Sequence, residues 1–202
     1  MEIRYCSACG NDITRGIPPD DHAERFHCAS CGHVEYNNPI PLVLCLLHTS
    51  DKILMIRRAI PPYVDSWAPP GGYIEQGESI DDAAVREIRE EVGIEIDPES
   101  LMPYSIVSIP TINQICIICR SELPDEVRPR LGAEASEAEW FNRDNMPFDD
   151  YFLPAHKDGL KMFYASLRTG RFRVFMAEAS YSDGFNRSVR VVRGERRETN
   201  DG

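Results

Sequence analysis

The stretch GGYIEQGESIDDAAVREIREEVGI, residues 71–94, predicts a glycine-rich loop followed by one amphipathic helix. Ser79 is a favourable N-cap, and Asp82 three positions later completes a pair that resembles a capping box. Gly93 is a natural stop, because helices commonly end at a glycine in the left-handed conformation. Aliphatic residues recur every four positions and give the helix one apolar face, at Ile80, Ala84, Ile88 and Val92.

Three glutamates on this helix, Glu87, Glu90 and Glu91, are spaced i, i+3 and i+4. Their carboxylates therefore share one sector of the helix, where like charges repel by roughly 0.2–0.5 kcal/mol per pair. A divalent cation would remove this repulsion, and oxygen ligands alone suit Mg²⁺ or Mn²⁺ rather than zinc. Arg86 precedes Glu90 by four residues and can orient that carboxylate. Taken alone, the carboxylates are equally consistent with a solvated acidic face.

The complete spacing of the stretch distinguishes these two interpretations. From Gly72 to Ile94 it fits the pattern G-x5-E-x7-R-E-U-x-E-E-x-G-U, where U is aliphatic, at every fixed position. The chain therefore resembles the Nudix hydrolases. The segment WAPPGG (67–72) is similar to the family's usual lead-in, and Arg57-Arg58 ends the preceding strand as in many members.

This resemblance implies an α+β fold, an α/β/α sandwich with a mixed sheet, and hydrolysis of a nucleoside diphosphate linked to another moiety. It implies that catalytic Mg²⁺ or Mn²⁺ is held by glutamates and one backbone carbonyl, at Gly72, Glu78, Glu87, Glu90 and Glu91. Such cations neutralise an anionic diphosphate in an acidic protein and position an attacking water. On the same resemblance we expect substrate contacts at Arg57, Trp67 and Pro110, and we expect Arg86 and Glu90 to take part in catalysis.

The reaction also needs a general base. Similar members carry an acidic residue three positions before an aromatic pair, which here is Glu137 before Trp140-Phe141. We expect Glu137 to be the base, with Glu134 and Glu90 as alternatives. Ordinary loop acids ahead of a strand would give the same local sequence.

Two CxxCG knuckles near the N-terminus predict a structural zinc site. The pairs Cys6/Cys9 and Cys28/Cys31 are separated by 18 residues, and four thiolates saturate one tetrahedral ion. Two disulfides or four free thiols are the alternatives. Three nearby histidines are then expected to be ordinary polar residues, at His22, His27 and His33.

A zinc ribbon before the box resembles two Nudix groups, which differ in substrate. The NADH pyrophosphatases carry an SQPWPFP-like signature after the box, and this chain has VSIPTINQI (107–115) instead. The second group, related to FAD and ADP-ribose pyrophosphatases, shares an IP-x-I-x-Q-like segment and a C-terminal helix that ends near LRTG (167–170). We therefore expect hydrolysis of ADP-ribose or FAD to AMP and a phosphorylated remainder. NADH hydrolysis, a nucleotide-sensing regulator and a ribbon adaptor with a vestigial catalytic domain are the alternatives.

Composition limits the other classes of function. The 202 residues carry 33 acidic and 22 basic side chains, a formal charge of −11, which disfavours nucleic-acid and membrane-surface partners. The ribbon region, residues 1–35, has three arginines against six acids, a net charge of −3. No apolar run approaches the ~20 residues of a membrane span, and the N-terminus does not resemble a signal peptide. We expect a cytoplasmic enzyme with a small nucleotide substrate, and a homodimer by analogy alone.

The sequence predicts four segments. They are a zinc ribbon (1–36), a Nudix domain (37–150), a C-terminal helix with a short extended segment (151–179) and a mobile tail (180–202). A third CxxC, Cys116 to Cys119, lies in an apolar run expected to be a buried strand. Positions i and i+3 of a strand face opposite sides, so these two thiols are expected to pack in the core.

Overall fold

The computed structural model describes residues 3–152, 157–181 and 187–194. The chain divides into two compact units, Met1–Asn38 and Pro39–Gly202, close to the boundary expected at residues 36–37. No helix in the described part of the chain is long and apolar enough to cross a membrane.

The first unit is a small antiparallel sheet with two cysteine knuckles. Its strands are β1 (Thr14–Gly16), β2 (Arg25–His27) and β3 (Val34–Glu35), in that order across the sheet. The buried core consists of Cys6, Ile13 and Cys28, with Phe26 and Ile3 packed against it. So few apolar side chains cannot stabilise about 35 residues by burial alone, and the predicted zinc site would supply the missing folding free energy.

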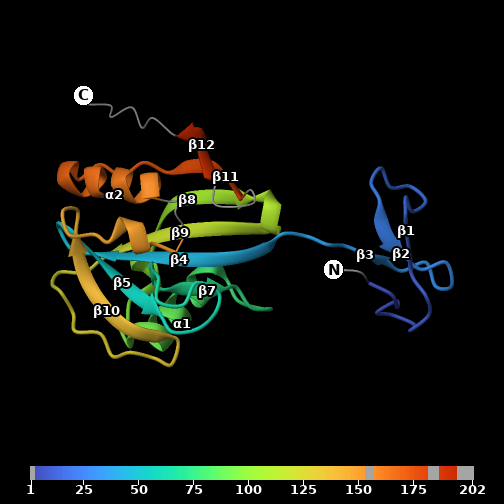
Figure 1. The fold of residues 1–202 in the computed structure, drawn as a ribbon, viewed down its shortest axis with the longest axis horizontal. Helices are drawn as coiled ribbons and strands as arrows, with labels where there is room; N and C mark the ends of the chain where they lie inside the picture. The colour runs from blue at the N-terminus through green and yellow to red at the C-terminus, as the bar shows by residue number, and fades with distance from the viewer. Residues whose placement is uncertain (1–2, 153–156, 182–186, 195–202) are drawn as a thin grey trace. The chain divides into compact units, whose positions relative to one another are not determined.

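The second unit is built on one mixed sheet (Figure 1). The strand order is β10 (Ala135–Asn142), β5 (Lys52–Arg58), β4 (Ile40–His48), β9 (Gln114–Glu122), β8 (Met102–Ile109), β11 (Phe175–Tyr181) and β12 (Arg187–Gly194). Two short strands extend it, β6 (Trp67–Ala68) beside β5 and β7 (Gly71–Tyr73) beside β4. The pairs β4/β9 and β8/β11 are parallel and the remaining pairs are antiparallel.

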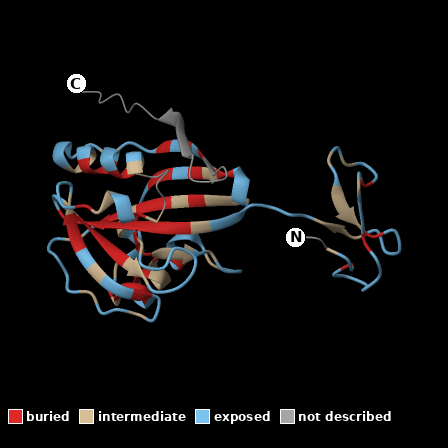
Figure 2. Cartoon of the chain, viewed as in Figure 1, coloured by how far each residue is buried: buried red, intermediate tan, exposed pale blue. Residues whose placement is uncertain are grey.

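One helix covers each face of this sheet, α1 (Ile80–Val92) and α2 (Lys157–Thr169) (Figure 1). Strand β4 shows the reason, because its residues alternate between two cores: Val43, Cys45 and Leu47 pack with α1, and Leu44 and Leu46 pack with α2. Figure 2 shows the buried residues concentrated along β4 and β5, between the two helices. The predicted α/β/α sandwich with a mixed sheet is confirmed.

Local signals placed α1 correctly. The Ser79 hydroxyl accepts a hydrogen bond from the Asp82 amide at 3.1 Å, and the Asp82 carboxylate accepts one from the Ser79 amide at 3.1 Å. Gly93 ends the helix with φ of 63°. Short 3₁₀ turns connect other elements: η1 (Pro98–Ser100), η2 (Pro110–Ile112) and η3 (Phe148–Asp150).

Two C-terminal expectations differ from the structure. The short extended segment predicted after the helix becomes a full strand, β11, inside the sheet. The mobile tail expected from residue 180 contains β12, whose Val189 and Val191 pair with Ala179 and Ala177 of β11. The polar composition of this segment concealed an alternation of valine with polar residues, which suits a strand. Residues 182–186 and 195–202 of the expected tail lie outside the described residues.

The third CxxC behaves as expected. Cys116 belongs to the core on the α2 side of the sheet and Cys119 to the core on the α1 side. Two sulfurs on opposite faces of one strand cannot share a metal ion.

A buried histidine lies where β4 ends. The ring of His48 is 1% exposed and packs against Phe163 and Phe172, with ring centroids 5.3 and 5.6 Å away. Its Nδ1 lies 3.0 Å from the Thr49 carbonyl oxygen, and Nε2 has no hydrogen-bond partner among the described residues. The ring is therefore neutral, with its proton on Nδ1.

We expect His48 to make the stability of the second unit depend on pH. Burial lowers its pKa below 6.5, and this outweighs the Thr49 hydrogen bond and the Glu122 charge, which raise it; the Arg120 charge adds a smaller lowering. Below pH 6.5 the unfolded chain binds a proton that the folded chain resists, so stability is lost as pH falls through this range.

Thermal melting from pH 7.5 to 5 should show a smaller fall in melting temperature for His48→Gln than for wild type. The control His22→Gln changes an imidazole that is 94% exposed, and should melt as wild type does. Parallel pH curves for wild type and His48→Gln would contradict this prediction.

Candidate active site

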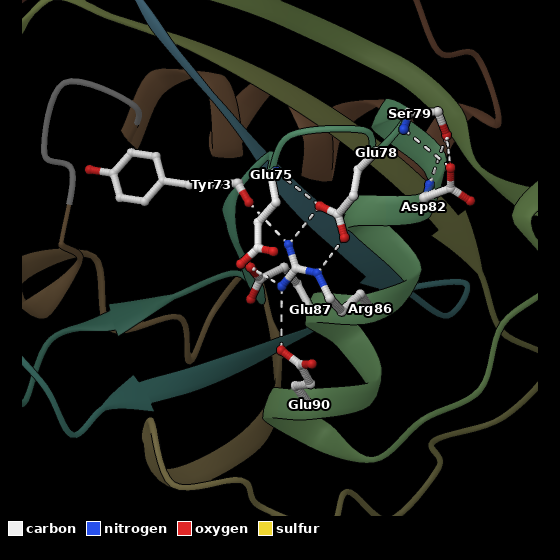
Figure 3. Close-up of polar contacts among 8 residues, drawn as sticks. All are labelled: Tyr73, Glu75, Glu78, Ser79, Asp82, Arg86, Glu87 and Glu90. Atoms are coloured by element: carbon white, nitrogen blue, oxygen red, sulfur yellow. Dashed lines mark hydrogen bonds and ion pairs between the residues drawn. The ribbon is translucent and has the colours of Figure 1, made fainter. Parts of the chain in front are cut away.

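The guanidinium of Arg86 on α1 lies at the centre of the predicted carboxylates (Figure 3). It donates through Nε and Nη2 to both oxygens of Glu78 at 2.6 and 2.9 Å, and through Nη1 to Glu87 at 2.7 Å. A longer bond of 3.3 Å reaches Glu90 one turn further along. The expected Arg86–Glu90 contact is therefore present, but Glu78 and Glu87 hold the guanidinium more closely.

These contacts have opposite effects on the two nearer carboxylates. The bidentate Arg86 contact lowers the pKa of Glu78 to about 2. The pKa of Glu87 is raised instead, because burial of its carboxylate outweighs the Arg86 hydrogen bond. The site therefore holds a partly buried carboxylate that one arginine does not fully stabilise.

Glu91 is the most deeply buried of the box glutamates, at 4% exposure. Burial raises its pKa to about 8, although its Oε2 accepts a hydrogen bond of 2.7 Å from the Gly71 amide. The charges of Glu87 and Glu134 raise the pKa further. A cation beside this carboxyl would favour its ionised form.

Two adjacent glycines allow the loop to approach the helix. A Cβ at Gly72 would lie 2.4 Å from a carboxylate oxygen of Glu87. Gly71 has φ of 147°, and a Cβ there would lie 2.1 Å from the Val43 carbonyl oxygen. Gly71 has no room for a Cβ because the clash would be with backbone, and a Cβ at Gly72 would displace the Glu87 carboxylate, which explains the first fixed residue of the motif.

The candidate bases lie on and just before β10. Glu137 is 54% exposed and accepts a hydrogen bond of 2.9 Å from Arg57 Nη1. Glu134 lies close enough to Glu87 and Glu91 for its charge to raise the pKa of both. The third candidate, Glu90, is 55% exposed beside Arg86.

The three predicted substrate contacts differ in their exposure and in their partners. Arg57 is engaged by Glu137 and by the Asp65 carbonyl oxygen at 3.2 Å. Pro110 is exposed at the start of η2. Trp67 is only 7% exposed and stacks edge-on against Phe141 at 4.8 Å, so it belongs to the core. A side chain buried in this way presents little surface to a ligand, and a substrate contact at Trp67 stays a prediction.

Sequence reasoning missed Tyr73 and Gln114. The Tyr73 carbonyl oxygen accepts a hydrogen bond from Arg86 at 3.1 Å, and its side chain is 54% exposed. The Gln114 amide donates to the Tyr73 hydroxyl at 2.9 Å and links β9 to the box. Tyr73 occupies an unspecified position of the motif, and Gln114 is distant in sequence, so the only available signal was the IP-x-I-x-Q-like segment.

The acidic cluster suits a divalent cation chemically. One guanidinium faces three carboxylates, Glu78, Glu87 and Glu90, and buried Glu91 lies on the same helix. Every candidate ligand atom is an oxygen, as Mg²⁺ and Mn²⁺ prefer. Among the described residues only the four cysteines bring three or more ligand atoms within 4.8 Å of one another. The glutamates therefore turn toward Arg86 rather than toward a common centre, and the ligand role of the Gly72 carbonyl stays a prediction.

The four cysteines fit a zinc ion. Cys6 and Cys31 sulfurs are 3.7 Å apart and those of Cys9 and Cys28 are 3.6 Å apart. Zn–S bonds of about 2.3 Å place the sulfurs of a tetrahedral site about 3.8 Å apart. The backbone amide of Cys31 lowers the pKa of Cys28 to about 6, which favours the thiolate that zinc requires. All seven cysteines are free of disulfides, as expected for the zinc interpretation.

The chain belongs to the Nudix family: the NUDIX domain model matches residues 39–163, more than half of the chain. A second family model, the zinc ribbon found at the N-terminus of Nudix proteins (Nudix N-terminal), matches residues 4–37. Nudix enzymes use Mg²⁺ or Mn²⁺, and the ribbon match agrees with the four-cysteine site.

Individual relatives carry two different activities in their names. The chain is 31% identical over 147 residues to an NAD-capped RNA hydrolase, NudC, of Pseudomonas aeruginosa, covering 71% of this chain and 49% of the relative. It is 33% identical over 121 residues to an ADP-ribose pyrophosphatase of Methanocaldococcus jannaschii, covering 55% and 67%. The chain thus spans about half the length of the NudC proteins that it matches. A solved NUDIX hydrolase of Nitrosomonas europaea superimposes with a TM-score of 0.80 at 28% identity, over 89% of this chain and all of that one.

Proposed function

We propose that this chain hydrolyses the pyrophosphate bond of a nucleoside diphosphate derivative, with ADP-ribose as the first candidate and FAD as the second. The observation that carries the proposal is the acidic cluster of the Nudix box, in which Arg86 binds Glu78, Glu87 and Glu90 and burial raises the pKa of both Glu87 and Glu91. The named ADP-ribose pyrophosphatase of M. jannaschii supports this choice of substrate.

The residues of the site divide into two roles. Glu78, Glu87, Glu90 and Glu91 would hold Mg²⁺ or Mn²⁺, which supplies charge neutralisation of the diphosphate when it is bound. Arg86 holds the carboxylates in place while the cation is absent and orients them when it is present. Glu137, with Glu134 and Glu90 as alternatives, accepts the proton of the attacking water as the P–O bond breaks, and AMP and a phosphorylated remainder are released.

A second substrate class is supported by the NudC relatives. These relatives are named as NAD-capped RNA hydrolases, so the exclusion of nucleic acid that we drew from net charge is not supported. Free NADH and an NAD-capped RNA both contain a pyrophosphate bond, and the same cation-binding carboxylates could support its hydrolysis. A purely nucleotide-sensing role is disfavoured because every fixed residue of the box is present.

The substrate proposal can be tested on the zinc-loaded chain with Mg²⁺ or Mn²⁺. ADP-ribose, FAD, NADH, NAD-capped RNA, diadenosine polyphosphates and nucleoside triphosphates would be compared by kcat/KM. We expect AMP release from ADP-ribose to be fastest and to stop with EDTA. Fastest turnover of NADH or NAD-capped RNA would favour the second class. Binding of ADP-ribose without hydrolysis of any compound would favour a sensor and refute the enzyme proposal.

A further inference from the structure

The segment before β10 lies directly against the C-terminal end of α1. The Arg130 amide donates to the Val92 carbonyl oxygen at 2.8 Å, and the Gly132 amide donates to the Glu91 carbonyl oxygen at 2.9 Å. The last carbonyls of a helix have no partner within the helix, so these two bonds satisfy groups that would otherwise need water. The segment thus caps the helix that carries the catalytic glutamates.

Gly132 makes this close approach possible. A Cβ at this position would lie 2.0 Å from the Glu90 carbonyl oxygen and 3.0 Å from the carbonyl carbon. Both atoms belong to backbone in the last turn of α1, which cannot swing aside as a long side chain can. Gly132 is not among the residues with positive φ. The glycine is therefore required for space rather than for backbone conformation.

Two residues later the chain is fixed from the opposite side. The Ala59 amide donates to the Glu134 carbonyl oxygen at 2.8 Å, and Ala135 then pairs with Arg58 at the start of the β10/β5 ladder. Glu134 is therefore held between the end of β5 and the end of α1. From this position the charge of Glu134 acts on Glu87 and Glu91, whose pKa values it raises.

We propose that Gly132 is a positioning residue, which lets its segment lie against the Glu90–Glu91 backbone and thereby sets the Glu134 carboxylate beside the cation-binding glutamates. The inference rests on the proposed function for its effect on turnover. Its effect on cation binding can be measured without any substrate.

Gly132→Ala tests the proposal in zinc-loaded, full-length protein. A Cβ should push the segment away from α1 and weaken Mn²⁺ binding by about tenfold, the lower end of the loss caused by removing a group that supports a metal ligand. Calorimetric titration would measure the Mn²⁺ affinity. We expect kcat to fall by a similar factor. The matched control is Gly159→Ala, because a Cβ at this helical glycine meets nothing within 4 Å. It should bind Mn²⁺ as wild type does.

A double-mutant cycle separates positioning from a general structural effect. If Gly132 acts through Glu134, Gly132→Ala should cause little further loss of Mn²⁺ affinity in a Glu134→Gln background. Full additivity, or unchanged Mn²⁺ affinity in Gly132→Ala, would overturn the proposal. If Gly132→Ala does not fold, Glu134→Gln alone decides, since unchanged Mn²⁺ affinity in that variant would also overturn it. Absence of hydrolysis in the wild type would refute the proposed function while leaving the Mn²⁺ comparison valid.

Discussion

Replacing Glu90 with glutamine is expected to remove most of the hydrolysis, lowering kcat by about 100-fold or more. Loss of a group that only supports a metal ligand costs roughly 10–100-fold, and loss of a ligand should cost at least the upper value. The Glu90 side chain is 55% exposed, and among the described residues its polar side-chain contact is the 3.3 Å bond from Arg86. The fold should therefore survive the change. Initial rates of AMP release at saturating Mg²⁺ would measure the effect.

The matched control for this prediction is Glu95→Gln. Glu95 is also exposed, and it follows the end of α1. It should keep the wild-type rate, and both variants should keep their zinc content and melting temperature. A Glu90→Gln rate within a few-fold of wild type would show that the box glutamates do not carry the reaction.

Features that depend on nearby residues were predictable from the sequence. The capping pair Ser79/Asp82 and the stop at Gly93 define α1 through contacts within a few positions. Each CxxCG knuckle is likewise a local turn, in which the Gly10 amide donates to the Cys6 carbonyl oxygen and the Gly32 amide to that of Cys28. In both cases the chemistry is set by spacing along the chain, so one sequence suffices.

Features that depend on distant partners were not predictable. The expected substrate contact Trp67 is buried because Phe141, more than 70 residues later, packs against it. The need for glycine at position 132 appears only when its segment meets the backbone of Glu90. The parallel pairing of β4 with β9 is a third case, because it joins residues that are far apart in the sequence, from Ile40 with Gln114 to His48 with Glu122. Long-range pairing decides each of these, and no local pattern encodes it.

Removing one zinc ligand is expected to unfold the first unit and leave the second intact. In Cys28→Ser the buried thiolate that the Cys31 amide stabilises is lost, and three ligands remain. Zinc contributes on the order of 10 kcal/mol to the folding of such small domains, far more than the buried side chains of this unit can supply. Metal analysis should find less than one zinc per chain. Amide resonances of residues 3–38 should lose their dispersion.

Cys119→Ala is the matched control, because it changes a buried cysteine of the other unit that also lies in a CxxC motif. It should keep one zinc per chain, since the Cys116 and Cys119 thiols face opposite sides of the sheet. The melting transition of residues 39–202 should be the same in Cys28→Ser as in wild type, because the chain forms two compact units. A full zinc complement in Cys28→Ser would refute the four-cysteine site. Loss of the second unit's transition in that variant would instead show that the ribbon stabilises the Nudix domain.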